Sequence, residues 1–508
     1  MSNTILELAQ ILQERQLLLS QLPQEEGTVT HITYDSREVS EGTLFFCKGE
    51  NFKSDYLKQA EANGAIAYVA EQPFDVTIPG LIVSDVRQAM PLVANYFYHE
   101  PWRAIHINAL TGTKGKTTTT HFLKAILDKH QMKHQQGETA YFSSTTTYDG
   151  VNRGPSQLTT PESIPLFQQL ANVRDSRIPF LTMEVSSQAL KYRRVDEVMF
   201  EMVGFLNIST DHIGTNEHPD FADYLQSKLR IFQHGQYAVI NCNTDYFDDV
   251  LAAAQASETI DDIITFSREA ADADYWVDQI ISTPKGQEFV VHEGSSAHSL
   301  MLDMPGEFNI DNALMAIAMA RHYEVSWETI AEALAEVKAP GRMEVFVSDD
   351  DEVKAIVDYA HNKLSMEQLI LSARKLFPMA KVWVVTGSAG GKGVSRRKDM
   401  GEVIGRLADK SYLTADDNNF ESAYDIAKEI ETAILTENPT ADILMMTDDR
   451  QRAIKQALND ALEEPSDVVV LLAGKGTDDY FLINGEKIPY QSDSDFMKDY
   501  LKRYNQSK

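Results

Sequence analysis

The segment "ALTGTKGKTTTTHF", residues 109–122, constrains the fold more than any other part of this 508-residue chain. The apolar run "RAIHINAL" leads into it and is typical of a buried strand. The stretch "KTTTTHFLKAILDKHQ" follows, with Phe122, Ala125 and Ile126 on one helical face. A strand, a glycine-rich loop and a helix in this order predict a parallel α/β sheet whose loop can surround a phosphate.

The loop departs from the common nucleotide-binding pattern G-x-x-x-x-G-K-S/T at one position. Gly115, Lys116 and Thr117 supply the second half, but Leu110 stands where the first glycine is expected. Leu110 therefore predicts a strand that runs further before the loop turns. Backbone N–H groups of residues 112–118 can surround a phosphate, Lys116 can neutralise it, and the Thr117 hydroxyl can hold Mg²⁺. The alternative is a glycine turn without a ligand.

Composition narrows the class of protein. The net charge of −30 argues against a general nucleic-acid partner, which needs a basic surface. No apolar run approaches the roughly 20 residues that span a bilayer, so we expect no membrane partner. The N-terminal stretch reads as an amphipathic helix and not as a signal peptide, and the only two cysteines, Cys47 and Cys242, fit a reduced compartment. We therefore expect a cytoplasmic protein.

The length predicts about three domains. Residues 1–103 mix short strands with helical stretches and predict a small α/β domain. Residues 104–339 predict a central domain with a P-loop-type parallel sheet. After Pro340 and Gly341, residues 340–508 alternate apolar runs with helical stretches, which predicts a Rossmann-like doubly wound domain.

Within this frame, "TGTKGKTTT" resembles the ATP loop of the Mur ligase family, which has the form TGTxGKT and lacks the first glycine. These enzymes build the peptide stem of bacterial cell-wall precursors, and related members add glutamate to folates. "GEFNIDNALMAIA", "APGRMEV" and "VDYAHN" resemble further nucleotide segments of the family. The resemblance implies an ATP site made of Gly112, Thr113, Lys114, Gly115, Lys116, Thr117, Thr118, Asn312, Arg342 and Asp358.

The resemblance also implies two Mg²⁺ ions. Glu184 in "LTMEVSSQAL" would join Thr117 at the first, and His212 would be a ligand of the second. Lys228 stands where the family carries a carbamylated lysine, whose added carboxylate can bind a metal that a free ammonium would repel. Taken alone, Glu184 reads equally well as an exposed strand-end acid, and Lys228 reads better as a solvated helix residue.

The chemistry implied is ATP-dependent amide ligation. A carboxylate is a poor acyl donor, so the γ-phosphoryl group of ATP is transferred to it, and an amine then attacks the acyl phosphate. Lys116 and the metals would neutralise charge on the phosphates, and domain closure would exclude water from the intermediate.

The N-terminal segment "ITYDSREVSEGTLFFCKGENFKSDYL" resembles the first domain of the branch that adds the third residue of the stem peptide. A folate-type ligase, the alternative within the family, would not need this module. The resemblance implies a UDP-N-acetylmuramoyl dipeptide substrate. Its contacts would be Ser36, Thr159, Thr160, Ser186 and Arg194.

The amino acid to be added follows from the stretch "LTADDNNFES". Branch members that use meso-diaminopimelate carry D-N-P-R here, and the arginine grips the second carboxylate. Asn419 replaces that arginine, so we expect L-lysine, whose distal ammonium suits the aspartates. Ornithine stays open, because one methylene is worth only about 1–3 kcal/mol. The implied pocket comprises Arg397 for the α-carboxylate, with Asp416, Asp417, Asn418, Asn419, Gly474 and Asp478.

A function of another class stays open: the chain could be a P-loop ATPase or a regulatory nucleotide-binding protein without ligase chemistry. Phosphate release that needs both the UDP-linked peptide and an amino acid would exclude it. We expect a monomer.

Overall fold

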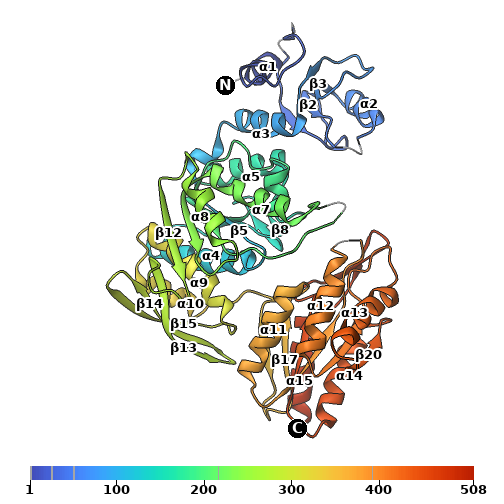
Figure 1. Ribbon diagram of the computed structural model, residues 1–508. Coiled ribbons are helices and arrows are strands. Elements are labelled where there is room, and N and C mark those ends of the chain that lie inside the picture. The colour runs from blue at the N-terminus through green and yellow to red at the C-terminus, as the bar shows by residue number, and fades with distance from the viewer. Residues whose placement is uncertain (1–2, 24–26, 50–51, 215–216, 392) are drawn as a thin grey trace.

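The computed structural model describes residues 3–23, 27–49, 52–214, 217–391 and 393–508. Three sheets of four, eleven and six strands follow one another along the chain, and the central domain lies between the other two (Figure 1). The predicted three-domain α/β architecture is confirmed. The boundaries after residues 103 and 339 fall in connections, the first inside the 3₁₀ helix η1 (Pro101–Ala104) and the second ahead of strand β16 (Glu344–Val347). Those boundaries stay predictions.

The N-terminal domain is a parallel sheet in the order β1-β2-β3-β4 with three helices. The expected amphipathic helix α1 is present, and a capping box between Thr4 and Glu7 fixes its first turn. Its apolar face buries Leu8 and Leu12. The elements are β1 (His31–Thr33), β2 (Thr43–Phe46), β3 (Ala65–Ala70), β4 (Gly80–Ile82), α1 (Ile5–Glu14), α2 (Ser54–Ala62) and α3 (Val86–Phe97).

The central sheet has the order β15-β14-β13-β12-β11-β10-β5-β9-β6-β7-β8. Its middle strands are parallel as predicted, but β13–β15 at one edge and β7–β8 at the other pair antiparallel. In β13 and β14, buried residues alternate in part with more exposed ones, as expected where only one face is covered. The strands are β5 (His106–Thr111), β6 (Ala140–Phe142), β7 (Thr146–Tyr148), β8 (Arg153–Pro155), β9 (Phe180–Glu184), β10 (Phe200–Phe205), β11 (Gly235–Asn241), β12 (Asp262–Ser267), β13 (Tyr275–Thr283), β14 (Gly286–Glu293) and β15 (Ser296–Leu302).

Helices cover both faces of the central sheet. Helix α4, which begins at the glycine-rich loop, packs with α9 and α10 in one core around Phe122 and Leu314. A second core joins α5 to α3 and α1 of the N-terminal domain. The central helices are α4 (Lys116–Lys133), α5 (Ser163–Asp175), α6 (Ser187–Lys191), α7 (Phe221–Leu229), the 3₁₀ helix η2 (Arg230–His234), α8 (Phe247–Gln255), α9 (Phe308–His322) and α10 (Trp327–Leu334).

The C-terminal sheet has the order β16-β17-β21-β18-β19-β20, parallel except for β16. Cores on its two faces show that it is doubly wound. Parallel order brings the carboxyl ends of neighbouring strands to one edge, where ligands bind in such folds. The remaining elements are β17 (Lys354–Asp358), β18 (Lys381–Thr386), β19 (Lys410–Thr414), β20 (Asp442–Met446), β21 (Val468–Ala473), β22 (Tyr480–Ile483), β23 (Glu486–Pro489), α11 (Lys363–Leu376), α12 (Ser395–Leu407), α13 (Ala423–Glu437), α14 (Arg450–Glu463) and α15 (Asp493–Ser507). In the described ranges, no helix combines the length and apolarity needed to cross a membrane.

Candidate active site

The glycine-rich loop joins β5 directly to α4. The strand runs to Thr111 with Leu110 buried in it, as the missing first glycine predicted. Gly115 has a φ of +87°, and a Cβ there would lie 2.2 Å from Oδ1 of Asn312. Only glycine therefore lets the loop approach helix α9 this closely. The contact brings Asn312, a residue of the predicted ATP site, to the phosphate loop.

Two lysine side chains meet on the inner side of this loop. The Nζ atoms of Lys116 and Lys228 each donate to the carbonyl oxygen of Gly112 at 2.8 Å. Lys228 is only 1% exposed, so it is not the solvated helix residue that a lone lysine suggests. Burial and the nearby Lys116 ammonium hold the pKa of Lys228 well below its usual range.

Oxygen atoms converge beside the first turn of α4. The Thr117 hydroxyl donates to the Glu184 carboxylate at 2.8 Å, and the Ser144 backbone N–H donates to the same oxygen at 2.8 Å. The hydroxyls of Thr117 and Ser144 are 2.9 Å apart. Three oxygens about 3 Å apart match neighbouring ligands of an octahedral cation with bonds of about 2.1 Å. The donor set therefore fits Mg²⁺. Ser144 was missed, because it lies in a serine- and threonine-rich stretch without a distinguishing pattern.

His212 follows β10 in a loop and has a φ of +57°. Its Nδ1 lies 2.7 Å from the Glu217 carboxylate, so the tautomer that fits this contact carries its proton on Nδ1 and has Nε2 as the acceptor. Metal-binding histidines are commonly oriented in this way by a carboxylate. Among the described residues, no three His, Cys, Asp or Glu side chains cluster as metal ligands, so a metal at His212 would need ligands of another kind.

One small cavity of about 130 Å³ gathers predicted residues that are far apart in sequence. The ATP side contributes Lys116, and the metal side contributes His212 and Lys228. The predicted peptide side contributes Thr159, Ser186 and Arg194, and the remaining lining residues are Leu158, Ser187 and Gln188.

Two further contacts hold the peptide side of this cavity in place. Thr160 lies behind it, its hydroxyl donating to the Glu184 carbonyl at 3.0 Å. Arg194 forms an ion pair with Glu162 at 2.8 Å, and Lys48 of the N-terminal domain joins the same carboxylate at 2.6 Å. Glu162 therefore ties the two domains together beside the cavity.

A larger cavity of about 430 Å³ opens where the N-terminal and central domains meet. Tyr34 and Arg37 line one side, and Gln157 and Glu162 line the other. The predicted contact Ser36 lies between the first two in sequence, but it is buried and its hydroxyl donates to Gln59 at 2.9 Å. The Ser36 hydroxyl therefore makes a contact within its own domain, and its role as a substrate contact stays a prediction.

The connection to the C-terminal domain carries Arg342 and Asp358. The Arg342 guanidinium lies 4.4 Å from the ring centre of Tyr359, a cation–π contact. Asp358 ends β17 and accepts from the Met343 backbone N–H at 2.9 Å. Burial raises the pKa of Asp358, although Arg342 opposes the shift. The two residues are thus neighbours, and their part in a nucleotide site stays a prediction.

The predicted amino-acid pocket contains a lysine that the sequence analysis overlooked. Lys475 is 1% exposed, and its Nζ lies 2.9 Å from Asp417 and 3.5 Å from Asp478. Asp416 is buried, and burial raises the pKa of its carboxyl, with Lys475 opposing. Gly474 has a φ of +116°, and a Cβ there would come within 2.6 Å of the Asp416 carboxylate. The aspartates therefore surround Lys475.

The two asparagines of the "DDNN" stretch make structural contacts. The Asn418 side chain donates to the Glu421 carbonyl at 2.7 Å. Asn419 has a φ of +50°, and its Oδ1 accepts from the Gly485 N–H at 2.8 Å. Its backbone N–H donates to Leu482 at 2.9 Å, so it fixes the hairpin β22–β23 against the pocket.

Comparisons with known proteins agree with this geometry. Residues 110–320 match the Mur ligase middle domain, and residues 341–476 match the Mur ligase glutamate ligase domain. A UDP-N-acetylmuramyl-tripeptide synthetase of Lactobacillus delbrueckii subsp. bulgaricus is 40% identical over 504 residues, covering 95% of this chain and 96% of the relative. The chain belongs to the Mur ligase family. It is therefore an ATP-dependent ligase.

Other relatives show the range of this Mur ligase's similarity. A UDP-N-acetylmuramoyl-L-alanyl-D-glutamate--L-lysine ligase of Enterococcus faecalis is 37% identical over 482 residues, covering 94% of this chain and 92% of that one. A solved UDP-N-acetylmuramoyl-L-alanyl-D-glutamate--2,6-diaminopimelate ligase shares the fold, with a TM-score of 0.67, 24% identity and 99% coverage of both chains. A Mycobacterium tuberculosis folylpolyglutamate synthase has a TM-score of 0.59 at 15% identity and covers 76% of this chain and 92% of its own.

Arg397 of this Mur ligase occupies a different setting from the one expected. Its guanidinium is almost fully buried and pairs with Glu421 at 2.9 Å and Glu429 at 3.1 Å. Its role at an α-carboxylate stays a prediction, which this ion-pair network does not favour. The preceding residue, Arg396, points instead to the central domain, where it pairs with Asp211 at 2.8 Å.

Proposed function

We propose that this Mur ligase adds L-lysine to UDP-N-acetylmuramoyl-L-alanyl-D-glutamate. The observation that carries the proposal is the small cavity in which the phosphate-loop residue Lys116 meets His212, Lys228 and the peptide-side residues. The full-length similarity to the tripeptide synthetases and to the L-lysine ligase of E. faecalis supports it.

In this proposal the phosphate loop binds the nucleotide. Backbone N–H groups of residues 112–118 face the phosphates, and Lys116 leaves the Gly112 carbonyl to neutralise them. The oxygens of Thr117, Ser144 and Glu184 would hold Mg²⁺. The ion would supply positive charge against the phosphate oxygens. Asn312, Arg342 and Asp358 would complete the nucleotide site.

We propose that the Lys228 side chain carries a carbamate. An unprotonated amine adds CO₂ and releases a proton, and burial beside another ammonium lowers the pKa of the Lys228 amine, which favours that form. The resulting anion would stand opposite His212, whose Nε2 is turned outward by Glu217. These two groups would hold the second Mg²⁺.

The reaction then proceeds in two steps. A carboxylate oxygen of the D-glutamyl residue attacks the γ-phosphorus of ATP, and ADP leaves with the bridging oxygen. The amine of the amino acid attacks the acyl carbon, phosphate leaves with one oxygen, and the amine loses a proton. Lys116 stabilises charge on the transferred group, and the buried setting of Lys228 keeps water away.

The UDP-linked end of the substrate belongs to the N-terminal domain in this proposal. The cavity of about 430 Å³ at the domain junction shares Leu158 with the small cavity, so one extended molecule can run from one to the other. Ser36, Thr159, Thr160, Ser186 and Arg194 are its proposed contacts. A cytoplasmic monomer with domain boundaries after residues 103 and 339 completes the proposal.

The amino-acid pocket favours a cation at the far end of the side chain. Asp416, Asp417 and Asp478 face the single ammonium of Lys475, so negative charge remains in excess. That charge suits the distal ammonium of lysine or ornithine, while the second carboxylate of diaminopimelate would be repelled.

An amino-acid panel tests the proposal. Purified protein, ATP, Mg²⁺ and the UDP-muramoyl dipeptide are incubated with L-lysine, L-ornithine or meso-diaminopimelate, and phosphate and tripeptide are measured. We expect lysine to give the fastest turnover and diaminopimelate almost none. Preference for diaminopimelate would overturn the pocket assignment, and ATP turnover without peptide or amino acid would overturn ligase chemistry.

A further inference from the structure

A buried carboxylate with no part in the scheme above lies one residue before His212. The Asp211 side chain is 1% exposed. It accepts from Arg396 Nε at 2.8 Å and from Asn362 Nδ2 at 2.6 Å. Lys114 Nζ lies 3.8 Å away. Asp211 belongs to the central domain, Lys114 to the phosphate loop, and the other two partners to the C-terminal domain.

This arrangement makes the pairing of Asp211 depend on domain docking. A buried carboxylate is costly unless it is paired and hydrogen-bonded. If the C-terminal domain moved away, Asp211 would keep Lys114 and the His212 backbone N–H, which it holds at 2.9 Å. It would lose both of its side-chain hydrogen bonds.

The phosphate loop has a second contact with the C-terminal domain. Lys114 Nζ donates to His361 Nε2 at 3.1 Å, because His361 Nδ1 donates to the Tyr359 carbonyl at 2.6 Å. The Lys114 backbone N–H is held by Asn207 at 2.9 Å. A movement of the C-terminal domain would therefore act on the loop through the Lys114 side chain, while the Lys114 backbone stays held by Asn207.

We propose that Asp211 is a positioning residue that couples docking of the C-terminal domain to the phosphate loop and to His212. Pairing with Arg396 and Asn362 stabilises the docked arrangement, in which His361 also holds the Lys114 side chain. The kinetic test of this inference rests on the proposed ligase function. The structural test rests only on the ion pairs between the domains.

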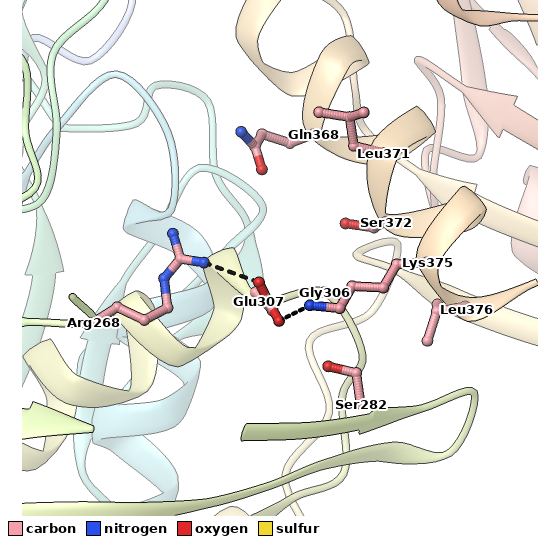
Figure 2. Close-up of a pocket in the computed structure, with 9 residues that line it drawn as sticks. All are labelled: Arg268, Ser282, Gly306, Glu307, Gln368, Leu371, Ser372, Lys375 and Leu376. Atoms are coloured by element: carbon pink, nitrogen blue, oxygen red, sulfur yellow. Dashed lines mark hydrogen bonds and ion pairs between the residues drawn. The ribbon is translucent and has the colours of Figure 1, made fainter. Parts of the chain in front are cut away.

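The same two domains are bridged by an exposed ion pair that serves as a matched control. Figure 2 shows Glu307 between Arg268 of its own domain and Lys375 of helix α11, at the edge of a cavity of about 170 Å³. The Lys375 side chain is 57% exposed. Exposed pairs contribute little, so its loss should leave docking intact.

The test is a double-mutant cycle on the full chain. Arg396→Gln and Asp211→Asn should each lower kcat on the order of 100-fold, because each leaves a buried charge unpaired. The double variant should have a kcat no lower than that of the less active single variant. Arg396→Lys should recover part of the activity. Lys375→Gln should change kcat less than about threefold. If the fold losses in kcat of the two single variants multiplied in the double variant, the coupling would be overturned.

Small-angle X-ray scattering gives a readout that does not depend on ligation. Arg396→Gln should have a larger radius of gyration than the wild type or Lys375→Gln, with an unchanged circular dichroism spectrum. An unchanged radius in a folded Arg396→Gln protein would overturn the proposal. If the wild type failed to ligate, the proposed function would fall while the scattering comparison still decided the docking role.

Discussion

Two lysines in different domains are buried to the same degree, but their pKa values are shifted in opposite directions. Lys228 and Lys475 are each 1% exposed. Lys228 faces the carbonyl of Gly112 and the ammonium of Lys116, and its pKa is held far below the usual range. Lys475 is also desolvated, but the aspartates around it outweigh burial and raise its pKa.

The contrast teaches that neighbours, and not burial alone, decide the charge of a buried amine. In the central domain, burial beside the Lys116 ammonium lowers the pKa of the Lys228 amine at the phosphate loop. The C-terminal domain keeps an ammonium that holds three carboxylates in one place.

The largest effect is expected from Lys228→Ala. Ligation should fall on the order of 1000-fold, because charge stabilisation by a bound metal is worth several kcal/mol. Short carboxylic acids such as acetate should restore part of the rate by replacing the carbamate. Steady-state kinetics with Lys338→Ala as the control, whose side chain is 71% exposed, checks this. Full activity in Lys228→Ala would contradict the metal-ligand role.

Lys475→Met should destabilise the protein by about 3 kcal/mol, because it leaves the Asp417 carboxylate without its buried partner. The KM for L-lysine should rise as the pocket loses its arrangement. Thermal unfolding and amino-acid titration measure the two effects, and Lys475→Arg is the charge-preserving control. A melting temperature equal to the wild type would contradict the pairing.

Lys228→Met should shift stability in the opposite direction. In CO₂-free buffer near pH 7, we expect a gain of about 1 kcal/mol, because the folded chain resists a proton that the unfolded lysine binds. The stabilised variant should remain inactive. Chemical denaturation measures the gain, and a loss of stability would show that the amine is charged or paired in the folded protein.

The smallest effect concerns alkaline pH. The folded pKa of Lys475 lies above its unfolded value of 10.5, so its contribution is complete below pH 10.5 and is lost as pH rises through the folded pKa. The stability difference between wild type and Lys475→Met should therefore stay constant from pH 7 to 9 and shrink in more alkaline buffer. A difference that grows with pH would reverse the assigned direction of the shift.

Much of the fold was predictable, because local pattern carries it. Apolar runs predicted the buried strands, and the glycine-rich loop after β5 predicted helix α4. The antiparallel strands β13–β15 were not anticipated. Their residues are only partly buried, so the sequence pattern that predicts a strand is weak there.

The site was predictable only where a motif names a residue. Lys116, His212 and Lys228 share one cavity although 112 residues separate the first from the last. Partners were harder to foresee, because sequence spacing does not tell which charges meet. Asp211 and Arg396 belong to different domains, and their ion pair exists only after both domains have folded and docked.

The hairpin β22–β23 bears on attempts to redesign amino-acid choice. Asn419 holds it through the Gly485 N–H and the Leu482 carbonyl, and the Asp417 carboxylate accepts from the Leu482 N–H at 2.9 Å. Replacing "DDNN" by another family motif would therefore remove side-chain bonds to the hairpin as well as change the pocket charge. A successful swap would have to move both segments together, which makes residues 416–419 and 480–489 one transplantable unit.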